Sequence, residues 1–564
     1  MVALALLLAA APQSPDLVLL NGRVYTLDAA APWAEAVVTS GERIAFVGKS
    51  ADARKKAPAG ARVIDLKGAF VVPGFHDGHV HIDETGELLL GVNLLDVHEP
   101  KAFADRIGAA TKRMPKGAWI TGTWGAYEDD AAKKGPPFAP TREMIDAVTP
   151  DHPVLVNRFD DTAFLANAKA LELAGVKSPT GLVSGKDLEK VRAAIPESPL
   201  ELKLLQLQAV LDEARAGGVT SIQDGVTSRE WLRAYREAER RGMLTTRLLA
   251  RPSLDLAPMA KELGLSQGFG SSSLKIVGFK AWVDGIMGNS SALFFEPYES
   301  QGKNRGKLRK IMFPEGREGW GMSMTREQKY TDAPPGNLEK LMLAAAEAGI
   351  PAHVHAIGDE GNRILLDVLE RVLPQAKLLG TDHRWRVIHA QVMDPPDIAR
   401  LGKLGLVAEV NPYHVTDDMR WMEKKIGSRC TGAYAFRSLK EAGAPLVFGS
   451  DSPGTMAARY YLSPVFGLYA AVTRQTLAGE PKEGWYPAQR LTIEEALDAY
   501  IRAPAWAAFE EHDKGTLSPG KLADLAVFDK NLVDVAKKNP RELLDARVLV
   551  TVTGGRVVYE RSGR

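Results

Sequence analysis

Cysteine is almost absent from the sequence, since Cys430 is the single cysteine among 564 residues. One cysteine cannot form an intrachain disulfide, and it cannot build a thiolate metal cluster. Any metal ion that the protein binds must therefore be held by nitrogen and oxygen ligands.

A charge excess of either sign is also absent, because 71 basic and 70 acidic residues leave a formal net charge of +1. The sequence contains no basic stripe and no acidic tail, which argues against nucleic acid and anionic membrane surfaces as partners. Hydrophobic residues make up 45% and charged residues 25%, as is ordinary for a globular protein. The sequence leaves open whether the chain forms a homo-oligomer.

The N-terminal apolar run, MVALALLLAAAPQ, is too short to span a bilayer as a helix, and no membrane span is expected. It resembles the apolar and cleavage regions of a secretory signal, although a basic region before it is missing. Two interpretations stay open. Residues 1–14 are a signal peptide of a periplasmic or secreted protein, or they are the frayed terminus of a cytoplasmic one.

Both ends of the chain are rich in short strand patterns. Residues 15–72 contain apolar runs separated by turn residues such as Gly22 and Gly41, and residues 513–564 show the same pattern. Because chain termini often lie close together in space, we expect one small β-domain assembled from both ends.

The middle of the chain, residues 73–512, alternates strand and helix patterns, which is typical of a parallel sheet with crossover helices. The helical patterns end with glycine just after the last apolar position. Eight strands are expected, and eight is the count of a (β/α)8 barrel. The strand candidates are residues 70–80, 218–224, 245–251, 274–282, 350–356, 384–390, 406–412 and 445–451.

Two long segments interrupt this repeat. Residues from about 90 to 200 separate the first two strands and carry a strand and a helix of their own, and residues from about 285 to 335 follow the fourth strand. Insertions of this length after barrel strands usually build lids or substrate pockets.

Polar side chains stand at the carboxyl ends of these strands, where barrel active sites form. His79 and His81 are two positions apart, so on a strand both imidazoles point to the same face and could hold one metal ion. A single histidine is more often a satisfied core residue, and a single aspartate is often a helix cap. Six matching positions together predict a site: His79, His81, Lys280, His355, His389 and Asp451.

At this point the chain resembles the amidohydrolase superfamily and, within it, the YtcJ-like branch, amidohydrolase family 3. The resemblance implies a TIM barrel with a small β-sandwich domain formed from both termini and an inserted lid or substrate segment. It covers nearly the whole chain and is carried by PGFHDGHVH (73–81), KAWVDGIMGNSSA (280–292), HAIGDEGN (355–362), RVIHAQ (386–391), FGSDSP (448–453) and GTLSPGKLADLAVFD (515–529).

The resemblance also implies a divalent metal site, with Zn2+ as the expected ion and one or two ions per chain. Lys280 stands where binuclear members carry a lysine that is carboxylated by CO2 and bridges two metals. A lysine ammonium would repel Zn2+, so Lys280 must lose its charge to be a ligand; an ordinary pairing with Asp284 is the alternative. Asp77 matches a family position and would orient a ligand histidine. The family's ligand positions match His79, His81, His355, His389 and Asp451.

The chemistry expected of such a site is hydrolysis of an amide-like C–N bond in a small molecule: an N-acyl, N-formyl or cyclic amide. A metal-activated water would attack, and Asp451 would take its proton and pass it to the leaving nitrogen. A deaminase or esterase on the same scaffold, and a catalytically silent homologue that binds a ligand, are the alternatives.

Substrate contacts are expected from the insertion and from the segment after strand seven. Trp124 lies in the insertion, and Asn411 stands where the family commonly has glutamine before proline. His414 and Trp421 follow it and would line the pocket, with aromatic packing under a lid as the alternative.

Overall fold

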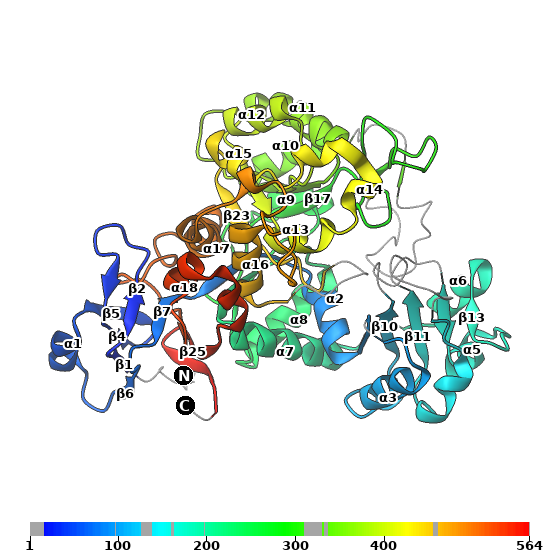
Figure 1. Ribbon diagram of the computed structural model, residues 1–564, viewed down its shortest axis with the longest axis horizontal. Coiled ribbons are helices and arrows are strands. Elements are labelled where there is room, and N and C mark those ends of the chain that lie inside the picture. The colour runs from blue at the N-terminus through cyan, green and yellow to red at the C-terminus, as the bar shows by residue number, and fades with distance from the viewer. Residues whose placement is uncertain are drawn as a thin grey trace, which may run out of the picture.

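The computed structural model describes residues 16–95, 97–125, 138–158, 163–196, 198–309, 330–331, 337–454 and 461–562. The expected signal peptide, residues 1–14, lies outside this range. Figure 1 shows three parts side by side: a β-rich part at the left, a central part of strands and helices, and the inserted segment at the right.

The β-rich part consists of two sheets that share one apolar core, to which Leu17, Val71 and Val550 belong. Strand β7 (Phe70–Pro73) pairs antiparallel with β24 (Leu525–Phe528), so the two ends of the chain meet in one sheet. The first sheet has the order β5-β4-β1-β6, with β1 (Leu17–Leu20), β4 (Ala36–Ser40), β5 (Arg43–Gly48), β6 (Arg62–Asp65) and the helix α1 (Ser50–Lys56) after β5. The second has the order β26-β25-β24-β7-β2-β3, with β2 (Arg23–Tyr25), β3 (Trp33–Ala34), β7 (Phe70–Pro73), β24 (Leu525–Phe528), β25 (Val548–Thr553) and β26 (Arg556–Glu560).

The central part contains two parallel sheets. Isolated parallel bridges join them at both sides, between Val80 and Ser452 and between Ser253 and Lys280. One sheet has the order β16-β15-β14-β8, with β8 (Phe75–Val80), β14 (Val219–Asp224), β15 (Arg247–Ala250) and β16 (Leu274–Ile276). The other has the order β17-β20-β21-β22-β23, with β17 (Phe279–Trp282), β20 (Ala352–Ala356), β21 (Arg386–His389), β22 (Val407–Val410) and β23 (Leu446–Phe448).

Two of the expected strands are each divided in two, and a glycine stands at each division. Residues 70–80 form β7 in the β-rich part and β8 in the central part, with Gly74 between them. A Cβ on Gly74 would lie 2.1 Å from Thr220 Oγ1. Residues 274–282 form β16 and β17, and a Cβ on Gly278 would lie 2.3 Å from His353 Cε1. Only glycine lets the backbone approach these side chains so closely.

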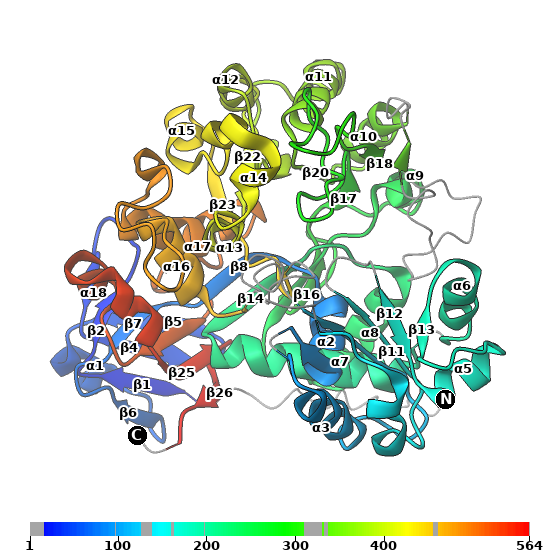
Figure 2. The same ribbon diagram turned by 45° about the vertical axis from the view of Figure 1, so that its right-hand side comes forward.

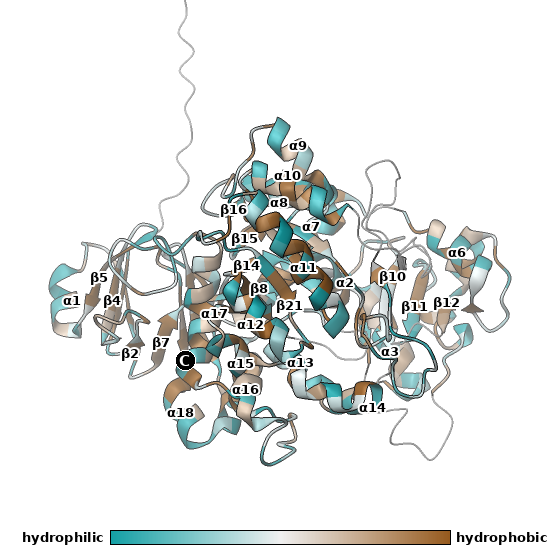
Figure 3. Cartoon of the chain, turned by 90° about the horizontal axis from the view of Figure 1, so that it is seen from above, coloured by the Kyte–Doolittle hydropathy of each residue, from teal (hydrophilic) through white to brown (hydrophobic). Residues whose placement is uncertain are grey.

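Helices surround the two parallel sheets, as Figure 2 shows. In α8 (Arg229–Arg240), Trp231, Ala234, Tyr235 and Ala238 are buried at a helical spacing, and the Ser228 side chain caps the helix. Figure 3 shows apolar colour gathered on the strands and polar colour on the outer helices. The helices are α2 (Ile82–Leu90), α7 (Leu200–Ala216), α8 (Arg229–Arg240), α9 (Ala257–Glu262), α10 (Leu338–Glu347), α11 (Asp359–Gln375), α12 (Pro395–Lys403), α13 (Pro412–Asp418), α14 (Met422–Ile426), α15 (Phe436–Glu441), α16 (Pro464–Thr473), α17 (Ile493–Ala507) and α18 (Leu532–Lys538). None of the helices in the described ranges combines the length and apolar character needed to cross a bilayer.

The inserted segment forms a sheet of its own, with the order β13-β12-β11-β10-β9. Its core contains Phe103, Ile107 and Val156, which pack α3 against the sheet. The elements are β9 (Val92–Leu94), α3 (Pro100–Thr111), β10 (Ile120–Trp124), β11 (Val154–Arg158), β12 (Phe164–Ala166), α5 (Ala168–Ala174), β13 (Leu182–Val183) and α6 (Gly185–Ala193). After β17, a short pair of strands, β18 (Leu308–Arg309) and β19 (Tyr330–Thr331), lies in the second long segment.

Candidate metal centre

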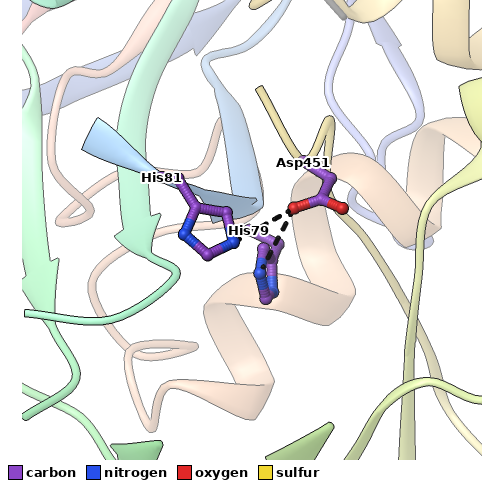
Figure 4. Close-up of side chains that lie close together, drawn as sticks. All are labelled: His79, His81 and Asp451. Atoms are coloured by element: carbon purple, nitrogen blue, oxygen red, sulfur yellow. Dashed lines mark ion pairs between the residues drawn. The ribbon is translucent and has the colours of Figure 1, made fainter. Parts of the chain in front are cut away.

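Three side chains meet at the carboxyl ends of β8 and β23. Figure 4 shows His79, His81 and Asp451 turned toward one another. Asp451 Oδ1 lies 3.5 Å from His79 Nε2 and 3.4 Å from His81 Nε2. One possible ligand atom from each residue lies within 4.8 Å of the others. The alternation of β8 thus brings the two histidines to one carboxylate from the other sheet.

The backbone holds these strand ends together. The Asp451 N–H donates to the His79 carbonyl at 2.8 Å, and Asp451 has a positive φ of 56°. A non-glycine residue in this region is strained, and such strain gathers at functional sites. Asp77, expected to orient a ligand histidine, accepts the backbone N–H groups of His79 at 3.2 Å and Ser450 at 2.8 Å. It therefore ties the strand that carries the histidines to the strand that precedes Asp451.

His355 and His389 form a second group beside the first. Their ring centroids are 4.6 Å apart, and the His389 ring lies 5.3 Å from that of His79. His389 Nδ1 lies 2.7 Å from Asn411 Oδ1, while Asn411 Nδ2 donates to the Gly449 carbonyl at 3.1 Å. Asn411, expected to contact substrate, lies against the His389 ring here and helps to orient it. His355 Nε2 lies 2.9 Å from a backbone carbonyl, that of Gly285.

Lys280 lies fully buried in β17, paired in register with His353. Asp284 accepts three backbone N–H groups, from Leu293 at 2.9 Å, Ile357 at 3.0 Å and Gly358 at 2.8 Å. The Asp284 carboxylate therefore fastens the segment after β17 to the end of β20.

Burial lowers the pKa of two of the site histidines, His79 and His389. Burial, together with the Lys280 charge, holds the pKa of His79 well below its usual range. Burial is also the main cause that lowers the pKa of His389 to about 3. Burial alone would raise the pKa of Asp451, but the hydrogen bond from His414 and the nearby histidines hold it well below its usual range. Neutral imidazoles beside a carboxylate are the donor set that Zn2+ prefers.

The geometry of the first group fits a metal ion. His79 Nε2 and Asp451 Oδ1 are buried and have no hydrogen-bond partner within the described part of the chain. They face each other at 3.5 Å. Two ligands of a tetrahedral ion, each about 2.1 Å from it, lie about 3.4 Å apart. An ion between them would satisfy both atoms.

The remaining candidates lie at different distances from this group. His414, in α13, places Nε2 3.1 Å from Asp451 Oδ2, so it belongs to the site itself. Trp421 is 8% exposed, with the Lys425 ammonium 5.2 Å from its ring centroid. Trp124 is 2% exposed and packs inside the insertion, with its ring centroid 6.4 Å from that of Phe103.

Three charged residues behind His79 were missed by the sequence analysis: Arg251, Arg386 and Glu409. All three side chains are buried. A signal was available for Glu409, which is the single charged residue in the apolar strand pattern LVAEVNP, whereas Arg251 and Arg386 each share their strand pattern with a second arginine. Charged residues are rarely buried in that way unless they are paired.

Gly225 leaves room for the imidazole rings of His79 and His81. A Cβ at this position would lie 3.1 Å from His79 Nε2 and 3.0 Å from His81 Cε1. We expect Gly225→Ala to weaken Zn2+ binding about tenfold or more, because crowding of this kind costs about 1–3 kcal/mol. Zinc content after dialysis measures the effect, with Gly108→Ala in α3 as the control. Equal zinc retention in both variants would contradict the expectation.

Histidines and a carboxylate gathered at the carboxyl ends of parallel strands are the kind of centre used by metal-dependent hydrolases. The chain belongs to the amidohydrolase family, whose model matches residues 62–559. The resemblance seen in the sequence is thereby confirmed. The protein is an enzyme of the class that hydrolyses carbon–nitrogen bonds of small molecules, and membership implies a divalent metal.

Individual relatives cover nearly the whole chain. Protein LONG AFTER FAR-RED 3 of Arabidopsis thaliana is 30% identical over 578 residues, 96% of this chain and 91% of that protein. N-substituted formamide deformylase of Arthrobacter pascens is 27% identical over 585 residues, 98% of this chain and 99% of that protein. The crystal structure of an uncharacterised metal-dependent hydrolase from Pyrococcus furiosus matches with a TM-score of 0.71 and 27% identity, covering 92% and 100% of the two chains.

Proposed function

We propose that this enzyme hydrolyses an N-acyl, N-formyl or cyclic amide with Zn2+ held by His79, His81 and Asp451, and with His355 and His389 beside them. The facing pair of buried, unsatisfied atoms, His79 Nε2 and Asp451 Oδ1, carries the proposal. The similarity to an N-substituted formamide deformylase over 98% of the chain supports an amide-like substrate.

The proposal includes the finer architecture. The two parallel sheets would form one TIM barrel over residues 73–512, which the isolated bridges at both sides support. The two terminal sheets would form a β-sandwich from residues 15–72 and 513–564, as their common apolar core supports. The segment of about residues 90–200 would be the lid or substrate insertion.

Asp451 has two carboxylate oxygens with different neighbours. Oδ1 faces the two histidines, whereas Oδ2 lies 3.1 Å from His414 Nε2. A divalent ion bound in the site would lower the pKa of a bound water and polarise the scissile carbonyl. Asp451 Oδ2 then accepts the proton of the attacking water and returns it to the leaving nitrogen, so that the C–N bond breaks and an amine leaves.

Lys280 would serve a second ion. Its neutral amine adds to CO2, forming an N–C bond and losing one proton, and the resulting carbamate carries the negative charge that a bridging ligand needs. We expect about two ions per chain in the wild type and about one in Lys280→Ala, determined by elemental analysis. Exposed Lys261→Ala is the control. One ion in the wild type would contradict the bridging role.

The substrate class is tested by a hydrolysis screen. N-formyl, N-acyl and cyclic amides are supplied with zinc or manganese and compared with amidines and esters of similar size. We expect turnover of amides, detected as released amine. Turnover confined to amidines would assign a deaminase, turnover confined to esters an esterase, and no turnover of any class a ligand-binding homologue.

A further inference from the structure

A buried cluster of charges lies directly behind His79. Glu409 Oε1 is 2.6 Å from His79 Nδ1. Arg251 Nη1 donates to Glu409 Oε1 at 2.7 Å and to Oε2 at 2.9 Å, and Arg386 Nη1 donates to Oε2 at 2.9 Å. Each of the four side chains is at most 1% exposed. Removing one carboxylate and two guanidinium groups from water costs free energy that only good hydrogen-bond geometry can offset.

The short contact decides which nitrogen of His79 carries hydrogen. Glu409 Oε1 can only accept a hydrogen bond, so at 2.6 Å His79 Nδ1 must donate. Arg251 Nη2 also approaches Nδ1, but at 3.3 Å, and it competes weakly. With hydrogen on Nδ1, the lone pair of the neutral ring lies on Nε2. Nε2 is the atom that faces Asp451 Oδ1.

The guanidinium groups fix the carboxylate in turn. Arg251 also donates through Nε to the Asp224 carbonyl at 2.5 Å and through Nη2 to the Gly78 carbonyl at 3.2 Å. Arg386 donates through Nη2 to the Ala507 carbonyl at 2.6 Å. These bonds to backbone carbonyls leave Glu409 little freedom to rotate.

The cluster also spans both parallel sheets. His79 is in β8, and Arg251 directly follows β15 in the same sheet. Arg386 is in β21 and Glu409 in β22, which belong to the other sheet. The orientation of a residue on one sheet is therefore set by a carboxylate on the other.

We propose that Glu409, clamped by Arg251 and Arg386, is a positioning residue that fixes the tautomer and ring orientation of His79 for metal binding. This inference rests on the metal site proposed above. Carboxylates that orient ligand histidines are worth about 10–100-fold in metal affinity. Because both arginines hold the Glu409 carboxylate, its position beside His79 is fixed.

The test measures Zn2+ affinity, not hydrolysis, in Glu409→Gln. We expect the Zn2+ dissociation constant, from competition with a chromophoric chelator, to rise about 10–100-fold. The absorption bands of the Co2+-substituted protein should also shift, because they report the geometry of the ligands.

Glu510→Gln is a matched control. Glu510 is likewise a buried glutamate held by two cations, Lys275 at 2.8 Å and Lys514. The Glu510→Gln variant should lose thermal stability, as Glu409→Gln does, but its Zn2+ affinity should equal that of the wild type. Unchanged affinity in Glu409→Gln, or an equal loss in both variants, would overturn the positioning role.

Glu409→Gln leaves two arginines without their carboxylate, and the variant could fail to fold. Combining Glu409→Gln with Arg386→Met restores the buried net charge of the wild type. We expect this double variant to fold and still to bind Zn2+ at least tenfold more weakly; wild-type affinity would overturn the inference. Because no readout involves substrate, a wild type that hydrolyses nothing in the amide screen would refute the proposed function alone.

Discussion

Asp451→Asn should reduce kcat by roughly 10³-fold or more, since proton transfer by a positioned side chain contributes about 10²–10⁴-fold and the substitution also weakens a metal ligand. The amide keeps the shape of the carboxylate but removes its charge and its capacity to accept a proton. The Asp451 Oδ2 position lies 3.1 Å from His414 Nε2, and a side chain of the same shape keeps that contact. Steady-state kinetics on the substrate found in the screen gives the measurement.

Two controls separate chemistry from folding. Asp105→Asn changes an exposed aspartate paired with Lys101 on α3 and should leave kcat within twofold of the wild type. The melting temperature of Asp451→Asn without metal should match that of the metal-free wild type within a few degrees. Full hydrolytic activity in Asp451→Asn would refute the proton-transfer role.

Removing the metal with a chelator should abolish hydrolysis and lower the melting temperature. The ion would supply both the nucleophile and the polarisation of the carbonyl, so no residual turnover above the uncatalysed rate is expected. A ligand at 100 times its dissociation constant stabilises the folded state by about 2.7 kcal/mol, which corresponds to a shift on the order of a few degrees. Activity assays and thermal melts on the same sample measure both effects.

Adding zinc back should restore both the hydrolytic activity and the melting temperature. Magnesium should restore neither, because imidazole ligands suit zinc and oxygen ligands suit magnesium. Chelated protein, shown by elemental analysis to be metal-free, that retains its wild-type kcat would refute metal dependence.

The parts of the site that local sequence determines could be predicted. His79 and His81 share a face because a strand alternates with a period of two, and this follows from two positions alone. The contact of these histidines with Asp451 depends on which strands become neighbours; the expected barrel brought the strand ends to one face, and the family resemblance added the ligand set.

Other features depend on residues that are distant in the chain. Glu409 lies on an apolar strand, and its charge is compensated by Arg251, 158 residues away, and by Arg386. The divisions at Gly74 and Gly278 depend on Thr220 and His353, which face them from other strands. The sequence around Trp124 shows the same limit, because an aromatic residue at a strand end gives the same pattern whether it lines a pocket or packs in a core.

The bridge between Val80 and Ser452 joins the first strand of the central part to the chain just after its last strand. His79 and His81 lie on one side of that junction and Asp451 on the other. A chain emerging from the ribosome therefore carries both histidines long before it carries the carboxylate. The ligand set proposed above would be complete only once residue 451 has been made and folded back, so a metal ion would enter the site after most of the chain has been synthesised.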